Sequence, residues 1–265
     1  MKTRLAVLSL VGLLVALPAA AAKKTIIISD SLTANAKQLA VDEGDRSPGQ
    51  VHQWRFGEYA VVSRKMGWTI TRTNGNSDGI QVNNLHVHSE KESATTTKFS
   101  FVLTNATADS ATVNAEHVVS TRSPGNWQLD LGHGSSVGSG GEEEQSDRFA
   151  AFITINSDTT ESWALYIHCA EGGGETVLTN GERRVVLSYA SSNKSRPNTR
   201  TWSAFSPPAE GYEFIENGQT LCALQYFVGS FGVHDYSVWI HGRPDARTRL
   251  VLAAAMTAVM QSLSL

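Results

Sequence analysis

The stretch that decides the fold is Leu250-Val251-Leu252-Ala253-Ala254-Ala255-Met256-Thr257-Ala258-Val259-Met260. Most of its residues favour helix. Pro244 and Asp245, just before it, suit the first turn of a helix and the positive end of its dipole. We therefore predict a helix over residues 245–264. Because a helix that is apolar all round must be enclosed by protein or by lipid, its surroundings decide the architecture.

Three interpretations of this helix stay open. The first is a membrane anchor, although Leu250 to Leu265 is short for a bilayer, which needs about 20 apolar residues, and contains Gln261, Ser262 and Ser264. The second is a cleaved sorting tail for a lipid anchor, with Arg243 to Arg249 as its polar spacer. The third is a core helix inside β structure. We prefer the third, because small alanine side chains let surrounding strands approach closely.

Outside the helix, strand patterns dominate the chain. Apolar residues alternate with polar ones in several runs, which is typical of half-buried strands; these are Phe99 to Leu103, Trp127 to Leu131, Phe149 to Ile155, Trp163 to Cys169 and Tyr236 to Ile240. Asn-Gly pairs separate apolar runs at Asn74-Gly75, Asn180-Gly181 and Asn217-Gly218, and such pairs favour tight hairpin turns. We predict hairpins over 176–189 and 212–228. The fold class is therefore mostly β: a many-stranded antiparallel barrel or sandwich with one apolar C-terminal helix buried in or against it.

One stretch, Gly132 to Asp147, interrupts the strand pattern. It is rich in Gly and Ser and carries Glu142-Glu143-Glu144, so we predict a mobile surface loop. The acidic triplet is interpreted as a solvated charge run rather than a loose calcium site. Ser136 is the centre of a Gly-x-Ser-x-Gly match, but no helix start follows it, as a nucleophile elbow requires. No linker demands a second domain, and we predict a single β domain over 23–265.

The N-terminal residues have the layout of a secretory signal peptide: basic Lys2 and Arg4, the apolar run Leu5 to Leu17, and small residues up to Ala22. We predict cleavage before Lys23, an exported protein that is periplasmic or extracellular, and no transmembrane helix in the mature chain. The chain has 22 basic and 25 acidic residues, and loss of Lys2 and Arg4 brings the formal charge from −3 to about −5. That balance argues against nucleic acid as a partner.

The cysteine count bears on crosslinking. Cys169 and Cys222 are the two cysteines of the chain, and an even count in an exported chain suggests one disulfide. A bridge across that separation would stabilise the fold by roughly 4 kcal/mol in the chain-entropy model. The alternative is two buried free thiols.

The order of elements resembles the tubby C-terminal-like fold, which tubby proteins, phospholipid scramblases and a plant defence-related family share. The resemblance rests on Gly211-Tyr212-Glu213-Phe214, the Asn217-Gly218 turn, and Trp239 ahead of Asp245 and the Ala-rich helix. It implies a many-stranded antiparallel barrel closed around the apolar helix. The chain departs from that family in carrying an export signal, and no basic phosphoinositide-binding residue of the family matches a position here. The resemblance therefore bears on the fold rather than on a ligand.

The best candidate for chemistry is His86-Val87-His88-Ser89-Glu90-Lys91-Glu92. Because residues two apart on a strand face the same way, His86 and His88 would present two imidazoles to one transition-metal ion, with Glu92 as a carboxylate ligand. The spacing is similar to the first motif of cupins, but the second cupin motif and the glycine after Glu92 are missing. A fourth ligand would come from one of three histidines, His117, His133 or His168. The plainer interpretation is a polar edge strand that runs into a charged loop.

Most of the tryptophans lie in alternating runs and are predicted to be core; Trp202, in the irregular region 191–208, is the best candidate for exposure. Two functions from different classes follow. The preferred one is a non-enzymatic exported β-barrel without a cofactor that binds a lipid surface, a small ligand or a protein. The alternative is a cupin-like metal-dependent enzyme that uses His86, His88 and Glu92.

Overall fold

A computed structural model describes residues 24–44, 50–74, 80–82, 85–88, 91–106, 109–123, 126–132, 135–139, 144–169, 176–193, 208–227 and 236–265. Within these ranges the chain is mostly β, with two helices, α1 (Asp30–Asn35) and α2 (Ala246–Leu263), and two antiparallel sheets. The signal-peptide prediction for residues 1–22 lies outside the described residues.

The larger sheet has twelve strands that nearly close into a barrel. Its strands, in order across the sheet, are β1 (Ala36–Ala40), β16 (Ser237–His241), β15 (Gln219–Phe227), β14 (Glu210–Glu216), β13 (Arg184–Ser191), β12 (Val177–Thr179), β11 (Asp158–Cys169), β10 (Glu144–Ile155), β7 (Ser110–Ser123), β6 (Lys91–Thr104), β3 (Tyr59–Asn74) and β2 (Arg55–Phe56). The two ends of this order meet where Asp42 and Arg55 exchange two backbone hydrogen bonds of 2.8 Å. The predicted mostly-β class and the antiparallel pairing are confirmed.

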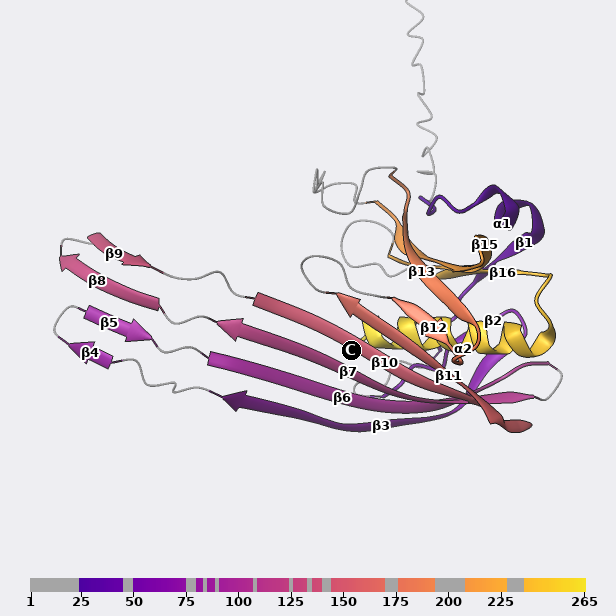
Figure 1. Cartoon of the computed structure of the whole chain (residues 1–265), viewed down its shortest axis with the longest axis horizontal. Helices are drawn as coiled ribbons and strands as arrows, with labels where there is room; N and C mark the ends of the chain where they lie inside the picture. The colour runs from indigo at the N-terminus through magenta and orange to yellow at the C-terminus, as the bar shows by residue number, and fades with distance from the viewer. Residues whose placement is uncertain are drawn as a thin grey trace, which may run out of the picture.

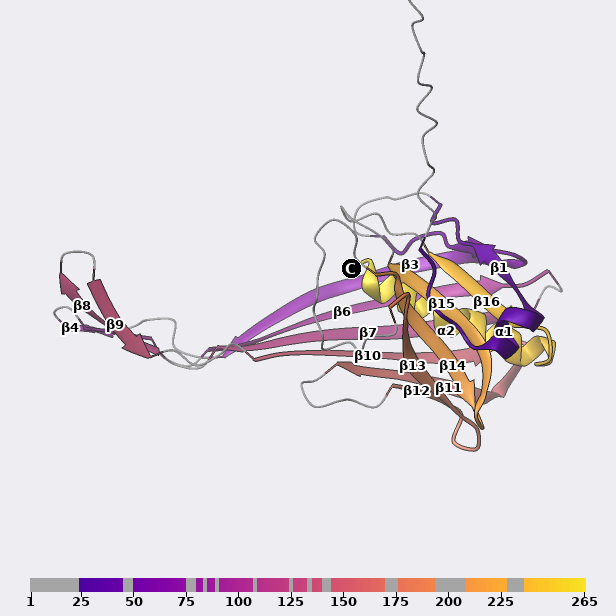
Figure 2. The ribbon, with the colours of Figure 1, turned by 90° about the horizontal axis from the view of Figure 1, so that it is seen from above.

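Helix α2 lies inside this barrel (Figure 2). It contacts β7 and β10 on one side and β15, several strands away in the sheet order, on another. Every residue from Leu250 to Ser262 is buried, so the barrel strands surround the helix and the core interpretation is confirmed. No helix within the described ranges combines the length and the apolar character that a membrane crossing requires.

The start of α2 agrees with the sequence prediction to within a residue. Asp245 is the N-cap, and its Oδ1 accepts a hydrogen bond of 2.9 Å from the backbone N–H of Thr248. Such a cap satisfies one of the helix N–H groups that has no partner inside the helix. The helix of 18 residues is about 27 Å long at 1.5 Å per residue.

The Asn-Gly turns join hairpins as predicted. Asn217 and Gly218 have φ values of 49° and 76° between β14 and β15, and Gly181 has a φ of 94° between β12 and β13. These positive values are the conformations that Asn and Gly adopt at little cost. The third predicted turn, Asn74-Gly75, includes a residue outside the described ranges.

Four strands of the barrel continue well beyond it. β3, β6, β7 and β10 project to one side, and a four-stranded sheet lies past their ends (Figure 1). We call residues 65–74, 91–98, 116–123 and 144–148 of these strands the arm. The sheet beyond it, the tip sheet, consists of β4 (Ile80–Val82), β5 (Leu85–His88), β8 (Asn126–Gly132) and β9 (Ser135–Ser139), in the order β4-β5-β8-β9.

The prediction of a surface loop over Gly132 to Asp147 is wrong for much of that stretch. Ser135–Ser139 pairs with β8, and 144–147 pairs with β7 as the first part of β10. Small Gly and Ser residues weaken a strand only locally, and pairing with neighbouring strands overrides that low propensity. Ser136 lies opposite Asp130 in an antiparallel pair, so it is not at a strand-to-helix turn and the nucleophile pattern is coincidental.

Candidate functional site

The arm is the candidate site, because its strands are long and the described side chains at its outer end face solvent. In β3, every residue from Trp68 to Asn74 is exposed. A two-sided, uncovered sheet cannot be held by a core of its own. Cross-strand pairs take over that role: Thr69 and Thr97 bring their hydroxyl oxygens within 3.3 Å, and those of Thr71 and Thr95 lie 3.0 Å apart. β-branched threonines fit extended backbone and stabilise such pairs.

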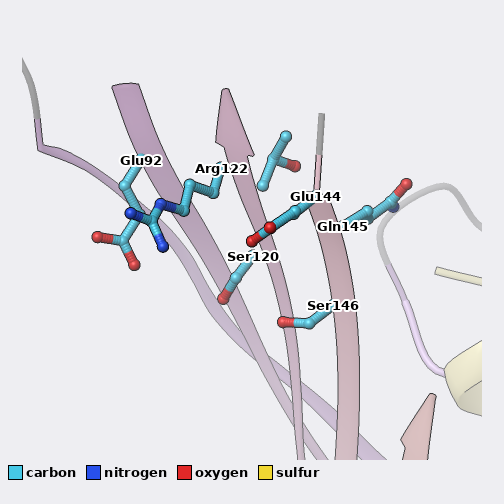
Figure 3. A pocket seen from close by; sticks show the side chains of 7 residues that line it. Glu92, Ser120, Arg122, Glu144, Gln145 and Ser146 are labelled. Atoms are coloured by element: carbon cyan, nitrogen blue, oxygen red, sulfur yellow. The ribbon is translucent and has the colours of Figure 1, made fainter. Parts of the chain in front are cut away.

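A row of charged residues crosses the outer end of the arm. Arg122 of β7 lies between Glu92 of β6 and Glu144 of β10 in the strand register. Figure 3 shows the side chains of Glu92 and Arg122 extending toward one another on the same side of the sheet. A pocket of about 460 Å³ opens at this row and is also lined by Ser120, Thr121, Gln145 and Ser146. The lining offers hydrogen bonds to a polar group.

Trp68 is the most exposed large apolar side chain of the described chain, at 89%. It lies in a bulge of β3, where the register with β6 shifts between Met66 and Thr69. The preceding Gly67 lets the strands approach closely, because a Cβ there would lie 2.9 Å from the carbonyl oxygen of Lys98. A bulge redirects side chains from the regular alternation, and Trp68 is accordingly displaced from the core.

The core prediction for tryptophan is thus wrong at Trp68, although Trp54, Trp163 and Trp239 are buried as expected. Trp202, the predicted exposed tryptophan, lies outside the described residues. The glycine directly before Trp68 is the only sequence signal of the bulge, because it interrupts the run of strand-forming residues.

The metal-site residues lie in the tip sheet and the arm rather than inside the barrel. His86 and His88 belong to β5, opposite Gln128 and Asn126 of β8, but their side chains are outside the described ones. Glu92 has the guanidinium-bearing Arg122 as its cross-strand neighbour. No group of three His, Cys, Asp or Glu that could hold a metal occurs among the described side chains, and the metal site stays a prediction.

The three candidates for a fourth ligand are placed separately. Nε2 of His117, in β7, lies 2.6 Å from Oδ1 of Asp147. This ring nitrogen is therefore engaged in a hydrogen bond within the arm. His168 lies in β11 opposite Arg148. His133 lies outside the described residues.

The cysteine prediction concerns β11 and β15. Cys222 is fully buried, and burial raises the pKa of its thiol well above the ordinary value. Cys169 ends β11, and its side chain is not among those described. The disulfide therefore stays a prediction, while the inaccessible thiol of Cys222 has no character of a reactive nucleophile.

A second polar cluster fastens the start of α2 to the barrel. Arg183 donates from Nε and Nη2 to the two carboxylate oxygens of Glu216 at 2.8 Å each, and from Nη1 to Oγ1 of Thr248 at 2.9 Å. Its guanidinium lies 5.2 Å from the centre of the Trp163 ring. Such a forked pair is geometrically specific. Because its groups are engaged with one another, we interpret the cluster as a structural clamp.

Arg247 joins the neighbouring strand β11 to the same helix. Its Nη1 lies 2.8 Å from Oδ2 of Asp158, at the beginning of β11. The hydroxyl and the backbone N–H of Thr160 donate to the same carboxylate, and together with Arg247 they lower the pKa of Asp158 to about 2. Both clamps act on α2 near its N-terminus, so the helix is fixed relative to the hairpins around it.

Comparisons with known proteins leave the site to be interpreted from its own chemistry. No family model matches the chain, and neither a curated protein nor a solved structure matches it significantly. The candidate site of the described residues is therefore the arm, with its charged row and the exposed Trp68.

Proposed function

We propose that this chain is an exported, non-enzymatic binding protein whose barrel is a scaffold and whose arm contacts the partner. The observation that carries the proposal is the filled interior: α2 occupies the barrel, and its residues from Leu250 to Ser262 are all buried. In a barrel that encloses a ligand, side chains leave a cavity inside. Here a helix takes that space, so binding falls to the outer surfaces.

The arm is the outer surface that fits this role best. Sheets that are stable alone have an apolar face or a covering element, yet the outer residues of β3 are exposed without one. The barrel holds the arm in place. The 16-residue β3 and the 14-residue β6 begin or end inside the barrel, where residues such as Val61 and Phe101 are buried. We also propose a fold of the tubby C-terminal-like type, from the order of elements in the sequence, and a periplasmic or extracellular location, from residues 1–22.

Site-specific photo-crosslinking in the chain's own host tests the binding role. A photo-reactive phenylalanine analogue replaces Trp68 on the arm or, as the matched control, Phe152, an aromatic residue of β10 on the barrel wall that is 49% exposed. We expect a discrete crosslinked partner at position 68 and none at 152. The same adducts at both positions, or adducts at 152 alone, would contradict a binding arm.

The enzyme alternative is tested by the native mass of the purified chain. We expect no stoichiometric metal. A mass higher by one transition-metal ion, lost in both His86→Ala and His88→Ala, would overturn the non-enzymatic proposal and place the chemistry in the tip sheet.

A further inference from the structure

β3 forms an open edge of the arm. β2 covers only Tyr59 and Ala60 of β3, whereas β6 pairs with its other side as far as Asn74. The backbone N–H of Val61 still bonds to the carbonyl of Trp54 at 2.9 Å. Beyond that point, over residues 65–74, no described strand pairs with the side of β3 that faces away from β6.

The threonine pairs indicate which backbone groups point to the open side. Hydroxyl contacts of 3.0–3.3 Å at Thr69–Thr97 and Thr71–Thr95 are typical of the non-hydrogen-bonded pairs of an antiparallel ladder, where the strands' side chains are closer. In such a pair, the N–H and C=O groups point away from the partner strand. Thr69 and Thr71 thus direct their backbone donors and acceptors outward, where an added strand would meet them.

The side chains along this edge are basic and apolar. Residues 65–74 contain Lys65 and Arg72 and no acidic residue, in a chain whose formal charge is −3. Both cations are exposed, and neither forms an ion pair with another residue that the structure describes. Trp68 and Ile70, at 89% and 49% exposure, add apolar surface beside them. The complementary partner is an extended segment that carries carboxylates and apolar side chains.

A second copy of the chain fits this edge poorly. Pairing β3 with another β3 would bring Lys65 and Arg72 together with the same cations of the other copy, and like charges across a strand pair are destabilising. Edge cations and bulges are also the devices that keep native edge strands from pairing with each other. The bulge at Gly67 and Trp68 and the two cations therefore select against self-association and leave an acidic strand as the fitting occupant.

We propose that residues 65–74 of β3 bind an extended acidic segment of a partner protein, which adds to the arm as a further strand. Backbone hydrogen bonds from Thr69 and Thr71 hold the segment, and Lys65 and Arg72 pair with its carboxylates. Trp68 and Ile70 cover its apolar side chains. This mode, strand addition to an exposed edge, rests on the proposed binding function and specifies its site and its partner chemistry.

Fluorescence anisotropy of the full chain with a labelled ten-residue peptide that repeats Glu-Thr-Val-Thr, so that glutamate and valine share one face of the added strand, tests the proposal. We expect saturable binding that weakens about tenfold or more with Arg72→Glu, the loss expected for a charge pair worth about 1.4 kcal/mol. Lys37→Glu, the same charge reversal on the exposed Lys37 of edge strand β1, is the matched control and should leave binding unchanged. Equal losses in the two variants, or none in either, would overturn the site.

Two further measurements separate strand addition from charge attraction alone. N-methylation of alternate peptide amides, and Thr71→Pro in the chain, remove outward hydrogen bonds without removing charge, and proline is tolerated where an edge N–H faces solvent. We expect each to weaken binding about tenfold. Unchanged affinity would overturn strand addition.

The acidic-strand proposal and the proposed binding function can fail independently, and the experiments distinguish the two. A crosslinked partner at position 68 together with no peptide binding would overturn the acidic-strand proposal and leave the binding arm standing. Concentration-dependent dimerisation in sedimentation that Thr71→Pro abolishes would make a second copy the occupant and likewise overturn it.

Discussion

Gln261 offers a sharp test of the filled barrel, and we predict that Gln261→Leu lowers the free energy of unfolding by about 2–4 kcal/mol. The side chain is 1% exposed near the end of α2. Its Oε1 accepts two hydrogen bonds, from the backbone N–H of His52 at 2.8 Å and from Nε1–H of Trp54 at 3.2 Å. Leucine matches the size of glutamine but removes the acceptor.

The magnitude follows from the two donors left behind. A buried donor without a partner costs about 1–3 kcal/mol. Trp54 is fully buried, so loss of the partner of its indole N–H costs about 1–3 kcal/mol. The His52 contact is part-buried, so loss of that partner costs about 1 kcal/mol, the lower end of the range. For a chain of this size, each kcal/mol lowers the melting temperature by about 2–4 °C. We therefore expect a fall of about 4–16 °C.

Thermal and urea unfolding of the purified chain measure the loss, with Thr257→Val as the matched control. Thr257 is fully buried in the same helix, but its hydroxyl donates only to the carbonyl of Ala253, four residues back. That carbonyl keeps its partner in the helix ladder, so the control should cost less than about 1 kcal/mol. If Gln261→Leu destabilises the chain no more than Thr257→Val, the enclosed helix and its contact to the segment before β2 are wrong.

Three further predictions follow from described contacts. The carboxyl of Asp158, whose folded pKa is about 2 against an ordinary 3.8, should stabilise the fold fully above about pH 4 and lose that contribution as the pH falls through 2; in Thr160→Ala, its carbon chemical shift should titrate nearer 3.8. Gly211→Ala should prevent stable folding, because its Cβ would lie 2.1 Å from a backbone oxygen of β15, whereas Gly218→Ala, with φ of 76° and open space around it, should cost about 1 kcal/mol in urea unfolding. The Cys222 thiol, wherever it is reduced, should resist Ellman's reagent in the folded chain and react on unfolding, since it is buried with a raised pKa; reaction at the rate of a free thiol would contradict its burial.

The parts of the fold that are built on burial could be predicted from the sequence. Helix α2 has an apolar surface all round, and only enclosure accommodates that. The hairpins at Asn180-Gly181 and Asn217-Gly218 have turns whose positive φ values suit those residues. In strands such as β10, the alternating residues Phe149, Ala151 and Ile153 are buried. In each case the local pattern and the tertiary environment agree.

The arm could not be predicted in this way, because burial does not hold it together. Its threonines and serines occur on both faces, so its strands lack the alternation that marks a half-buried sheet. Their pairing partners are distant in the sequence, as with Thr71 and Thr95, and no turn residue specifies them. Trp68 is a single-residue example. Its residue type predicts a core position, and only the bulge, which depends on pairing with β6, exposes it.

The sequence indicates one residue of the candidate site, Glu92, as a metal ligand beside His86 and His88. In the structure it belongs to a charged row with Arg122, whose partnership depends on the register of β6 and β7. Cross-strand neighbours of this kind are set by pairing over long separations, which a motif of seven consecutive residues does not contain.

The position of α2 in the chain has a consequence for how the barrel forms. Ribosomes make every described strand before the helix that fills the space between them, and the pairing of Ala36 with His241 joins segments some 200 residues apart. Contacts of such long range slow folding. The strands also lack the helix that forms the centre of their core until synthesis has passed residue 263. For the exported chain that we propose, this delay keeps the polypeptide extended while it crosses a membrane channel, and the turns of α2, which emerge after every described strand, complete the core.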